Sequence, residues 1–386
     1  MSQVPNNWQS TTSGEICEYI TSGSRDWKSY YSDHGPLFVR TQDINQDRLN
    51  LSDVAHVDLP AKVEGKRSRI QPGDLLVTIT GANVGKVALV PDEIPEAYVS
   101  QSVGLMRLKD KRNGLYLHYY LQSDQAGRKQ VLNLVYGIGR PVLSLQNLRD
   151  IPIALPPLPE QRRIVAEIEK QFTRLEAGVA ALRRVQANLK RYRAAVLKAA
   201  CEGKLVKGDA SKWKSEQLGK LVTIRYGKML PTKELSESGF PVFGANGIIG
   251  HHTRFLYEEE QVLISCRGAY SGKINLSPPQ CFITNNSLVL EMPEKPQVTK
   301  RFLFYALQAV DKSKMVTGSA QPQVTINNAE VAEVPIPPLA EQTRIVAEVE
   351  RRLSVVEELE SVVTANLQRA TRLRQSILQK AFTGEL

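Results

Sequence analysis

The sequence predicts an α+β fold in which two small α/β domains alternate with two long helices, so that one domain-helix unit occurs twice. Two observations predict this arrangement. A segment near the middle of the chain aligns without a gap with a segment close to residue 386, and both have the apolar spacing of a helix. The stretches that precede the two copies have the texture of strands and turns instead. The 386 residues leave room for two or three domains.

The repeated segment is an internal duplication. The stretch LPPLPEQRRIVAEIE from Leu155 matches IPPLAEQTRIVAEVE from Ile336. The same register continues to Gly203 and Leu205, which match Gly384 and Leu386. It also extends backwards, because GIGRPVLSLQN at 137–147 parallels GSAQPQVTINN at 318–328. A repeat of this kind predicts one scaffold used twice.

Each copy predicts one long helix. The Pro-Pro pair ends whatever precedes it, because proline disfavours the helical conformation of the residue before it. A narrow apolar stripe with charged flanks follows, and such a stripe is typical of a coiled-coil seam. The two helices are therefore expected to pair as an antiparallel coiled coil; the alternative is that each packs only on its own domain. The stripe residues are Ile164, Ile168, Phe172, Leu175, Val179, Leu182, Val185, Leu189 and Val196, then Ile345, Val349, Leu353, Val356, Val363, Leu367, Leu373 and Ile377.

The two domains contain β-branched and aromatic runs broken by Gly, Pro, Asn and Asp. Strands are predicted within 74–81 and 261–267, and helices at 115–121 and 300–307. Shared landmarks predict that the domains are diverged copies with an internal pseudo-two-fold relation. The landmarks are Trp8 and Trp213, GANVGK at 81–86 and GAYSGK at 268–273, and VSQ at 99–101 and ITN at 283–285.

Composition and motifs exclude most kinds of chemistry. The net charge of +10 favours a polyanionic partner. The four cysteines form no CxxC pair, and the five histidines show no ligand spacing, so no metal site is predicted. The two GxxxGK loops are one residue short of a phosphate-binding loop, and Val87 or Ile274 stands where that loop has Ser or Thr. No apolar run reaches a membrane-spanning length.

The order of parts resembles the specificity subunits of type I restriction-modification systems. The resemblance rests on PPLxEQxRIVAE at 156–167 and 337–348, on the helix ends at 197–205 and 378–386, and on Gly-Asp-Leu-Leu at 73–76. It covers essentially the whole chain, although the recognition domains match only in outline. It implies target-recognition domains at 1–155 and 208–336 and helical regions at 156–207 and 337–386.

The resemblance also implies the function. Such a subunit reads a bipartite, asymmetric site on double-stranded DNA and binds two modification subunits, which methylate adenine, and restriction subunits, which translocate and cleave DNA. The chain itself is expected to be non-catalytic and cytoplasmic, with S-adenosylmethionine, ATP and Mg²⁺ bound only by the partners. Whether restriction subunits are present stays open, as does the alternative of a stand-alone DNA-binding regulator with a coiled-coil spacer. An enzyme with hidden catalytic residues is a third possibility, but no Asn/Asp-Pro-Pro-aromatic loop supports it.

DNA contacts are predicted for basic, amide and hydroxyl side chains, because Lys and Arg bind phosphates and Arg, Asn and Gln read base edges. Those beside the shared turns carry most weight; for each, the alternative is an exposed side chain without a contact. The first domain supplies Arg25, Lys28, Arg40, Thr41, Gln42, Arg67, Arg69, Asn83, Lys86, Gln101 and Arg140. The second supplies Arg225, Lys228, Asn246, His251, Arg254, Arg267, Tyr270, Lys273, Asn285, Asn286 and Gln321.

The outward faces of the two helices are predicted to dock the two modification subunits. The alternative is a solvated face, the usual fate of such charges. Near-identity of the two copies fits two equivalent partners. The docking residues are Arg162, Arg163, Glu167, Glu169 and Lys170 in the first copy and Arg344, Glu348, Glu350 and Arg351 in the second.

Overall fold

The computed structural model describes residues 7–23, 25–60, 65–311, 313, 315–318, 321–383 and 385. The chain forms two compact units: unit 1 comprises Met1–Leu182 and Ala365–Leu386, and unit 2 comprises Arg183–Thr364. The division falls inside both long helices, so each unit combines one strand-rich domain with part of each helix. The domain boundaries derived from the resemblance stay a prediction. Gly384 and Leu386, the last matches of the repeat, lie outside the described residues.

Both predicted helices form. They are α5 (Leu158–Cys201) and α9 (Leu339–Thr383), and each begins directly after its Pro-Pro pair. Helix α5 ends at Cys201, two residues before a glycine: Gly203 takes a φ of +66°, and the Lys204 amide donates to the Ala199 carbonyl oxygen at 2.9 Å. This is the glycine C-cap geometry, in which an amide beyond the helix pairs with a carbonyl oxygen of its last turn.

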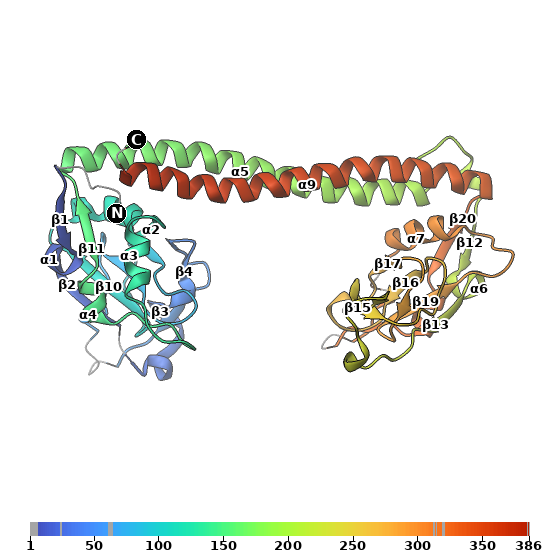
Figure 1. Ribbon diagram of the computed structural model, residues 1–386, viewed down its shortest axis with the longest axis horizontal. Helices are drawn as coiled ribbons and strands as arrows, with labels where there is room; N and C mark the ends of the chain where they lie inside the picture. Colours follow the sequence, from blue (N-terminus) through green and yellow to red (C-terminus); the bar gives the residue numbers. More distant parts are fainter. Residues whose placement is uncertain are drawn as a thin grey trace. The chain divides into compact units, whose positions relative to one another are not determined.

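The two helices pair in antiparallel fashion within each unit (Figure 1). In unit 1 the start of α5 buries Ile164 and Ile168 in the same core as Ile377 and Leu378 near the end of α9. In unit 2 the end of α5 buries Val196 with the start of α9, and Arg193 forms an ion pair with Glu357 at 3.2 Å. The prediction of a coiled-coil seam is confirmed.

Two stripe positions are wrong. Val185 and Leu373 are 41% and 51% exposed. A stripe drawn through apolar residues alone passes over position 374, which three- and four-residue steps from Leu367 through Ala370 reach. In α9 the half-buried Arg374, not Leu373, lies on the seam, with its guanidinium 3.9 Å from the centre of the Phe172 ring.

The domain of unit 1 is built on a four-stranded antiparallel sheet, a three-stranded mixed sheet and two short strand pairs. In the four-stranded sheet the strands lie in the order β2 (Cys17–Ser22), β10 (Val103–Leu108), β7 (Leu75–Thr78) and β8 (Val87–Leu89). In the three-stranded sheet the order is β6 (Ala55–Val57), β3 (Tyr31–Val39) and β9 (Ala97–Val99). The two pairs are β1 (Gln9–Thr12) with β11 (Pro152–Leu155) and β4 (Ile44–Asn45) with β5 (Arg48–Leu49). The helices are α1 (Ser13–Ile16), α2 (Gly114–Gln122), α3 (Gly127–Asn133) and α4 (Leu145–Arg149), with 3-10 turns η1 (Trp27–Tyr30), η2 (Thr41–Asp43) and η3 (Lys111–Asn113).

The domain of unit 2 repeats the four-stranded sheet strand for strand, which confirms the duplication. The four-stranded sheet has the order β13 (Thr223–Tyr226), β19 (Ser287–Glu291), β16 (Val262–Ser265) and β17 (Ile274–Leu276). A three-stranded sheet has the order β15 (Ile248–His252), β14 (Phe240–Phe243) and β18 (Phe282–Ile283), and β12 (Lys214–Gln217) pairs with β20 (Glu333–Ile336). The helices are α6 (Leu218–Leu221), α7 (Lys300–Ala309) and α8 (Ile326–Glu330), with η4 (Ala210–Lys212), η5 (Thr232–Glu234) and η6 (Gly268–Tyr270).

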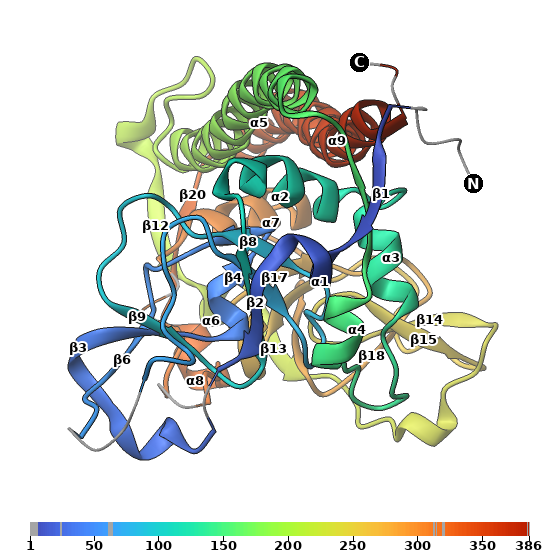
Figure 2. The same ribbon diagram turned by 90° about the vertical axis from the view of Figure 1, so that its left-hand side faces the viewer.

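One helix of each domain joins the domain to the long helices of its own unit. In unit 1, α2 lies beneath α5 and α9 in both views (Figures 1 and 2). Its Tyr116 and Leu117 are buried in one core with Ile168 and Phe382. In unit 2, α7 buries Phe302 with Val349 of α9 in the same way. Within the residues that the structure describes, no helix is long and apolar enough to cross a membrane.

Candidate nucleic-acid interface

The turn that joins β7 to β8 in unit 1 and β16 to β17 in unit 2 has the same backbone in both domains. In unit 1 the Thr78 amide donates to the Lys86 carbonyl oxygen at 2.9 Å. In unit 2 the Ser265 amide donates to the Lys273 carbonyl oxygen, also at 2.9 Å. The first glycine of each GxxxGK loop has a positive φ, +91° at Gly81 and +76° at the equivalent residue 268. These are tight turns with a lysine at the end, as predicted, and we name them the lysine turns, 78–86 and 265–273.

A hairpin leans on each lysine turn. In unit 1 Tyr136 and Val142 exchange backbone hydrogen bonds of 3.0 and 2.8 Å, and in unit 2 Thr317 and Gln323 exchange two of 2.9 Å. The amide of the first loop glycine donates to the carbonyl oxygen of Pro141 at 2.9 Å in unit 1 and of Pro322 at 3.2 Å in unit 2. We name these segments the tip hairpins, 136–142 and 317–323; residues 319 and 320 of the second lie outside the described part of the chain. The third shared element is the turn 100–103, equivalent to 284–287, which lies directly before β10 or β19.

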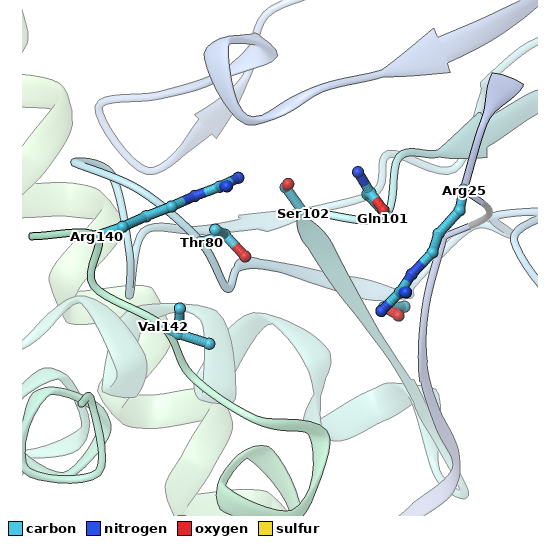
Figure 3. A pocket seen from close by; sticks show the side chains of 7 residues that line it. Arg25, Thr80, Gln101, Ser102, Arg140 and Val142 are labelled. Atoms are coloured by element: carbon cyan, nitrogen blue, oxygen red, sulfur yellow. The ribbon is translucent and has the colours of Figure 1, made fainter. Parts of the chain in front are cut away.

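In unit 1 these three elements enclose a basic groove (Figure 3). One hollow of about 630 Å³ is lined by Arg25, Arg67, Thr80 and Gln101 among others. An adjoining hollow of about 270 Å³ adds Arg140. Arg25 and Arg140 are exposed, and over the described part of the chain neither forms an ion pair. A groove with uncompensated guanidinium groups and neutral hydrogen-bonding side chains suits the phosphates and base edges of a nucleic acid.

Several predicted residues share this surface. In unit 1 Arg25, Arg67, Gln101 and Arg140 line the hollows, and Asn83 and Lys86 lie in the lysine turn. In unit 2 Arg267, Tyr270 and Lys273 lie in the lysine turn, Asn285 and Asn286 in the turn before β19, and Gln321 in the tip hairpin. Asn246 joins them because its side-chain oxygen accepts a hydrogen bond from Lys273, and Lys228 because its amide donates to the Ile283 carbonyl oxygen at 2.9 Å.

Other predicted residues lie elsewhere or pair with carboxylates of their own domain. Arg40 makes two hydrogen bonds to the buried Asp43 carboxylate, at 3.1 and 3.2 Å, and these raise its pKa. Arg225 pairs with Glu291 at 3.0 Å, and Arg69 lies 3.9 Å from Glu96. Lys28, Thr41 and Gln42 lie on η1 and η2, and His251 and Arg254 lie at the end of β15 and beyond it. No observation tests their contact with DNA.

The sequence analysis missed three groove residues. Ser22, Thr80 and Ser102 line the hollows beside Arg140, and Figure 3 shows the last two facing the groove. Their position next to the lysine turn and to Gln101 is the signal that points to them, because the neighbours of a shared turn lie on the same surface. Small hydroxyl side chains of this kind hydrogen-bond phosphates or base edges.

The identical Glu-Gln pair of the repeat performs an internal task. The Trp8 indole donates to Glu160 at 3.0 Å, and the Trp213 indole donates to Glu341 at 3.3 Å. The next residue fixes the chain that enters the helix, since the side-chain amide of Gln161 donates to the Pro156 carbonyl oxygen at 2.8 Å and its repeat equivalent donates to the Pro337 carbonyl oxygen. These contacts join the first strand of each domain to its helix. They explain, without an external partner, why the Glu-Gln pair is the same in both copies of the repeat.

The predicted docking residues form ion pairs within their helix or are exposed, except Glu350, which accepts a hydrogen bond from Tyr305 of α7. Glu167 pairs with Lys170 at 3.1 Å, and Glu348 pairs with Arg351 at 2.8 Å. Hydrogen bonds from Arg351 and Arg352 lower the pKa of Glu348 to about 2. Arg162 and Glu169 are exposed. Arg344 donates to the Lys207 carbonyl oxygen at 3.2 Å, Glu350 lies 3.8 Å from Arg301, and Arg163 takes part in a contact of its own.

The described residues form no constellation for metal or thiol chemistry. No group of three His, Cys, Asp or Glu side chains among them could hold a metal ion. The four cysteines are unpaired. Burial raises the pKa of Cys17 to about 12 and of Cys281 to about 11. A thiol in such an environment stays protonated and is a poor nucleophile.

Comparison with known proteins assigns the family. The family model "Type I restriction modification DNA specificity domain" matches residues 5–181 and 210–361. The specificity subunit of the StySPI enzyme from Salmonella potsdam is 22% identical across all of this chain and 90% of its own length. The EcoKI specificity subunit of Escherichia coli K12 is 24% identical over 92% of this chain and 83% of its own. The EcoBI specificity subunit of Escherichia coli is 27% identical over 63% of this chain and 60% of its own.

Solved structures agree on the fold. A chain from a study of complex assembly and conformational transition of the type I R-M system superimposes with a TM-score of 0.78 at 23% identity, with both chains fully covered. The HsdS subunit from Thermoanaerobacter tengcongensis superimposes with a TM-score of 0.53 at 22% identity, covering 100% of this chain and 98% of its own. The protein belongs to the family of type I restriction-modification DNA specificity subunits.

Proposed function

We propose that this chain reads a bipartite, asymmetric site on double-stranded DNA, with one half-site for each domain. The proposal rests on one observation: the two domains have the same turns and hairpin in their backbones, but most of the side chains on these turns differ between the domains. One scaffold with two different readers suits a site whose halves differ in sequence. The net charge of +10 and the unpaired arginines of the groove in unit 1 suit a polyanion.

Catalysis belongs, in this proposal, to partner subunits. Two modification subunits methylate adenine and bind S-adenosylmethionine, and restriction subunits, where present, cleave DNA with ATP and Mg²⁺. Membership of the specificity-subunit family supports this division of tasks. The modification subunits dock on the outer faces of α5 and α9, where Glu167 with Lys170 and Glu348 with Arg351 present matching pairs of charges.

A map of modified bases tests the proposal. Genomic DNA is compared from cells that express this chain with its modification subunit and from cells that express the modification subunit alone. N6-methyladenine within a split motif is expected only where this chain is present. Co-purification of the two proteins, and an activity test of the modification subunit, serve as controls.

The opposite result has a definite meaning. If an active modification subunit co-purifies with the chain and no new methylation appears, the chain does not direct modification. Selection of bound duplexes with the isolated protein then tests the stand-alone regulator, for which specific binding without a partner is required. The matched relatives named above are all specificity subunits, so they do not favour the regulator.

A further inference from the structure

The shared turns allow the two domains to be compared residue by residue. The backbone hydrogen bonds of the lysine turns place Lys86 opposite Lys273. In the tip hairpins Arg140 corresponds to Gln321. A glycine three residues earlier has a φ of +95° in one hairpin and +82° in the other, and an added Cβ on it would lie 2.7 Å from the carbonyl oxygen of Arg140 or Gln321 alike. The side chains of Arg140 and Gln321 therefore leave equivalent points of the backbone.

Equivalent positions fall into two classes. The lysine that ends the lysine turn is the same in both domains. The hairpin residue differs, as does a position in the lysine turn, where Thr80 corresponds to Arg267. Phosphates are the same at every base pair, so a residue that contacts them need not change with the target. A residue that contacts base edges must change whenever the base changes. The varied positions on an unchanged backbone are therefore the base-reading ones.

The environment of Arg140 fits that role. The side chain extends over the groove near Thr80 and Ser102 (Figure 3), with both neighbours neutral. In the described part of the chain no carboxylate neutralises it, in contrast to Arg40, which Asp43 holds. A guanidinium with its five donors available pairs in bidentate fashion with the O6 and N7 atoms of guanine, whereas a glutamine amide pairs with the N6 and N7 atoms of adenine.

We propose, on the basis of the function proposed above, that Arg140 reads a guanine in the half-site of the first domain and that Gln321 reads an adenine at the corresponding position of the other half-site. Lys86 and Lys273 contact phosphates in both. The same hairpin position thus sets one base of each half-site.

Reciprocal substitutions test the assignment. The full-length chain is expressed with its modification subunit as wild type, as Arg140→Gln and as Gln321→Arg, and the methylated motifs are mapped. Arg140→Gln is expected to change one guanine of the first half-site to adenine or to relax it, with a loss of discrimination of roughly 5- to 150-fold, and to leave the other half-site intact. Gln321→Arg is expected to act only on the other half-site. Arg112→Gln is the matched control, because it removes the same charge beyond the opposite end of β10 from the groove and should keep both half-sites.

The possible outcomes distinguish failure of the proposed function from failure of the base assignment. If the wild-type chain yields no split motif, the proposed function fails and the assignment with it. If the wild-type motif is present and Arg140→Gln leaves it unchanged, the assignment alone is overturned. Where a variant gives no methylation, binding of the complex to duplexes that differ at single half-site positions replaces the map. A loss confined to one guanine position supports base contact, and a loss by the same factor for every duplex shows a phosphate contact and overturns the assignment.

Discussion

At the scale of single residues, local partners decide which arginines are available to a ligand. Arg40 and Arg140 are both predicted DNA contacts in the first domain. Arg40 is held by the carboxylate of Asp43, three residues along, and by the Asp53 carbonyl oxygen at 2.7 Å. Arg140 stands on a hairpin tip with no acidic residue near it in sequence. An acidic residue three or four positions from an arginine can pair with it, so the sequence alone indicates that such an arginine is less available to DNA.

A buried histidine predicts a pH dependence for unit 1. His118 lies on α2, with its Nε2 atom 2.9 Å from the Asp47 carbonyl oxygen. Burial lowers its pKa, so the folded protein holds it neutral while the unfolded chain takes up a proton below about pH 6.5. The unfolded state then binds more protons than the folded state, so this contribution to stability is complete above pH 6.5 and is lost as the pH falls below it, with a slope of at most about 1.4 kcal/mol per pH unit.

Urea unfolding between pH 5 and 8, followed by hydrogen exchange in α2, measures this slope. His118→Gln keeps a hydrogen-bonding side chain and removes the titration, so the variant should lose less stability than the wild type on acidification. Equal losses in the two proteins would show that another group carries the pH dependence.

At the scale of elements, a charged side chain lies in the seam between the long helices in unit 1. Arg374 stacks on Phe172, donates to Gln122 at 3.1 Å and lies 3.7 Å from Glu176. One side chain therefore links α9 to α5 and to α2, the helix that carries the domain. Gln122 is buried, so the loss of its donor would leave its amide oxygen unsatisfied.

Arg374→Ala is expected to destabilise unit 1 by about 1–3 kcal/mol, because it removes both the stacking and a buried hydrogen bond to a charged group. Hydrogen exchange in 365–383 and in α2 reports it locally, without an assumption of two-state unfolding of the whole chain. The exposed neighbour Arg372 provides the matched control, and its replacement by alanine should change stability by no more than about 0.5 kcal/mol. Equal effects of the two substitutions would show that Arg374 contributes no more to stability than an exposed surface arginine.

At the scale of the whole molecule, the sequence predicts what depends on local pattern and misses what depends on distant partners. The duplicated helices, the strands β7 and β16 and the lysine turns follow from spacing, glycines and proline pairs within a few residues, whereas the pairing of β2 with β10 joins segments that are far apart in sequence. The place of Arg374 in the seam does not, since it depends on Phe172 and Gln122, which are far away in sequence. The groove is intermediate: Gln101 and Arg140 follow from the repeat, whereas Thr80 and Ser102 need the three-dimensional arrangement of the turns.

The continuity of α5 and α9 predicts that helix length sets the distance between half-sites. Both units draw on the same two helices, and the boundary falls near Leu182 in α5 and near Thr364 in α9. One heptad inserted at each of these points keeps the seam in phase and adds about 10 Å of helix. The spacer of the methylated motif should lengthen by no more than about three base pairs, while the bases of both half-sites stay the same.

Two further variants test the same prediction. Deletion of four residues within 179–189 should shorten the spacer. A seven-residue insertion after the exposed Lys295, in the loop between β19 and α7, should leave it unchanged. Motif mapping measures all three, and a spacer that stays constant in the heptad variant would show that the helices do not act as the ruler.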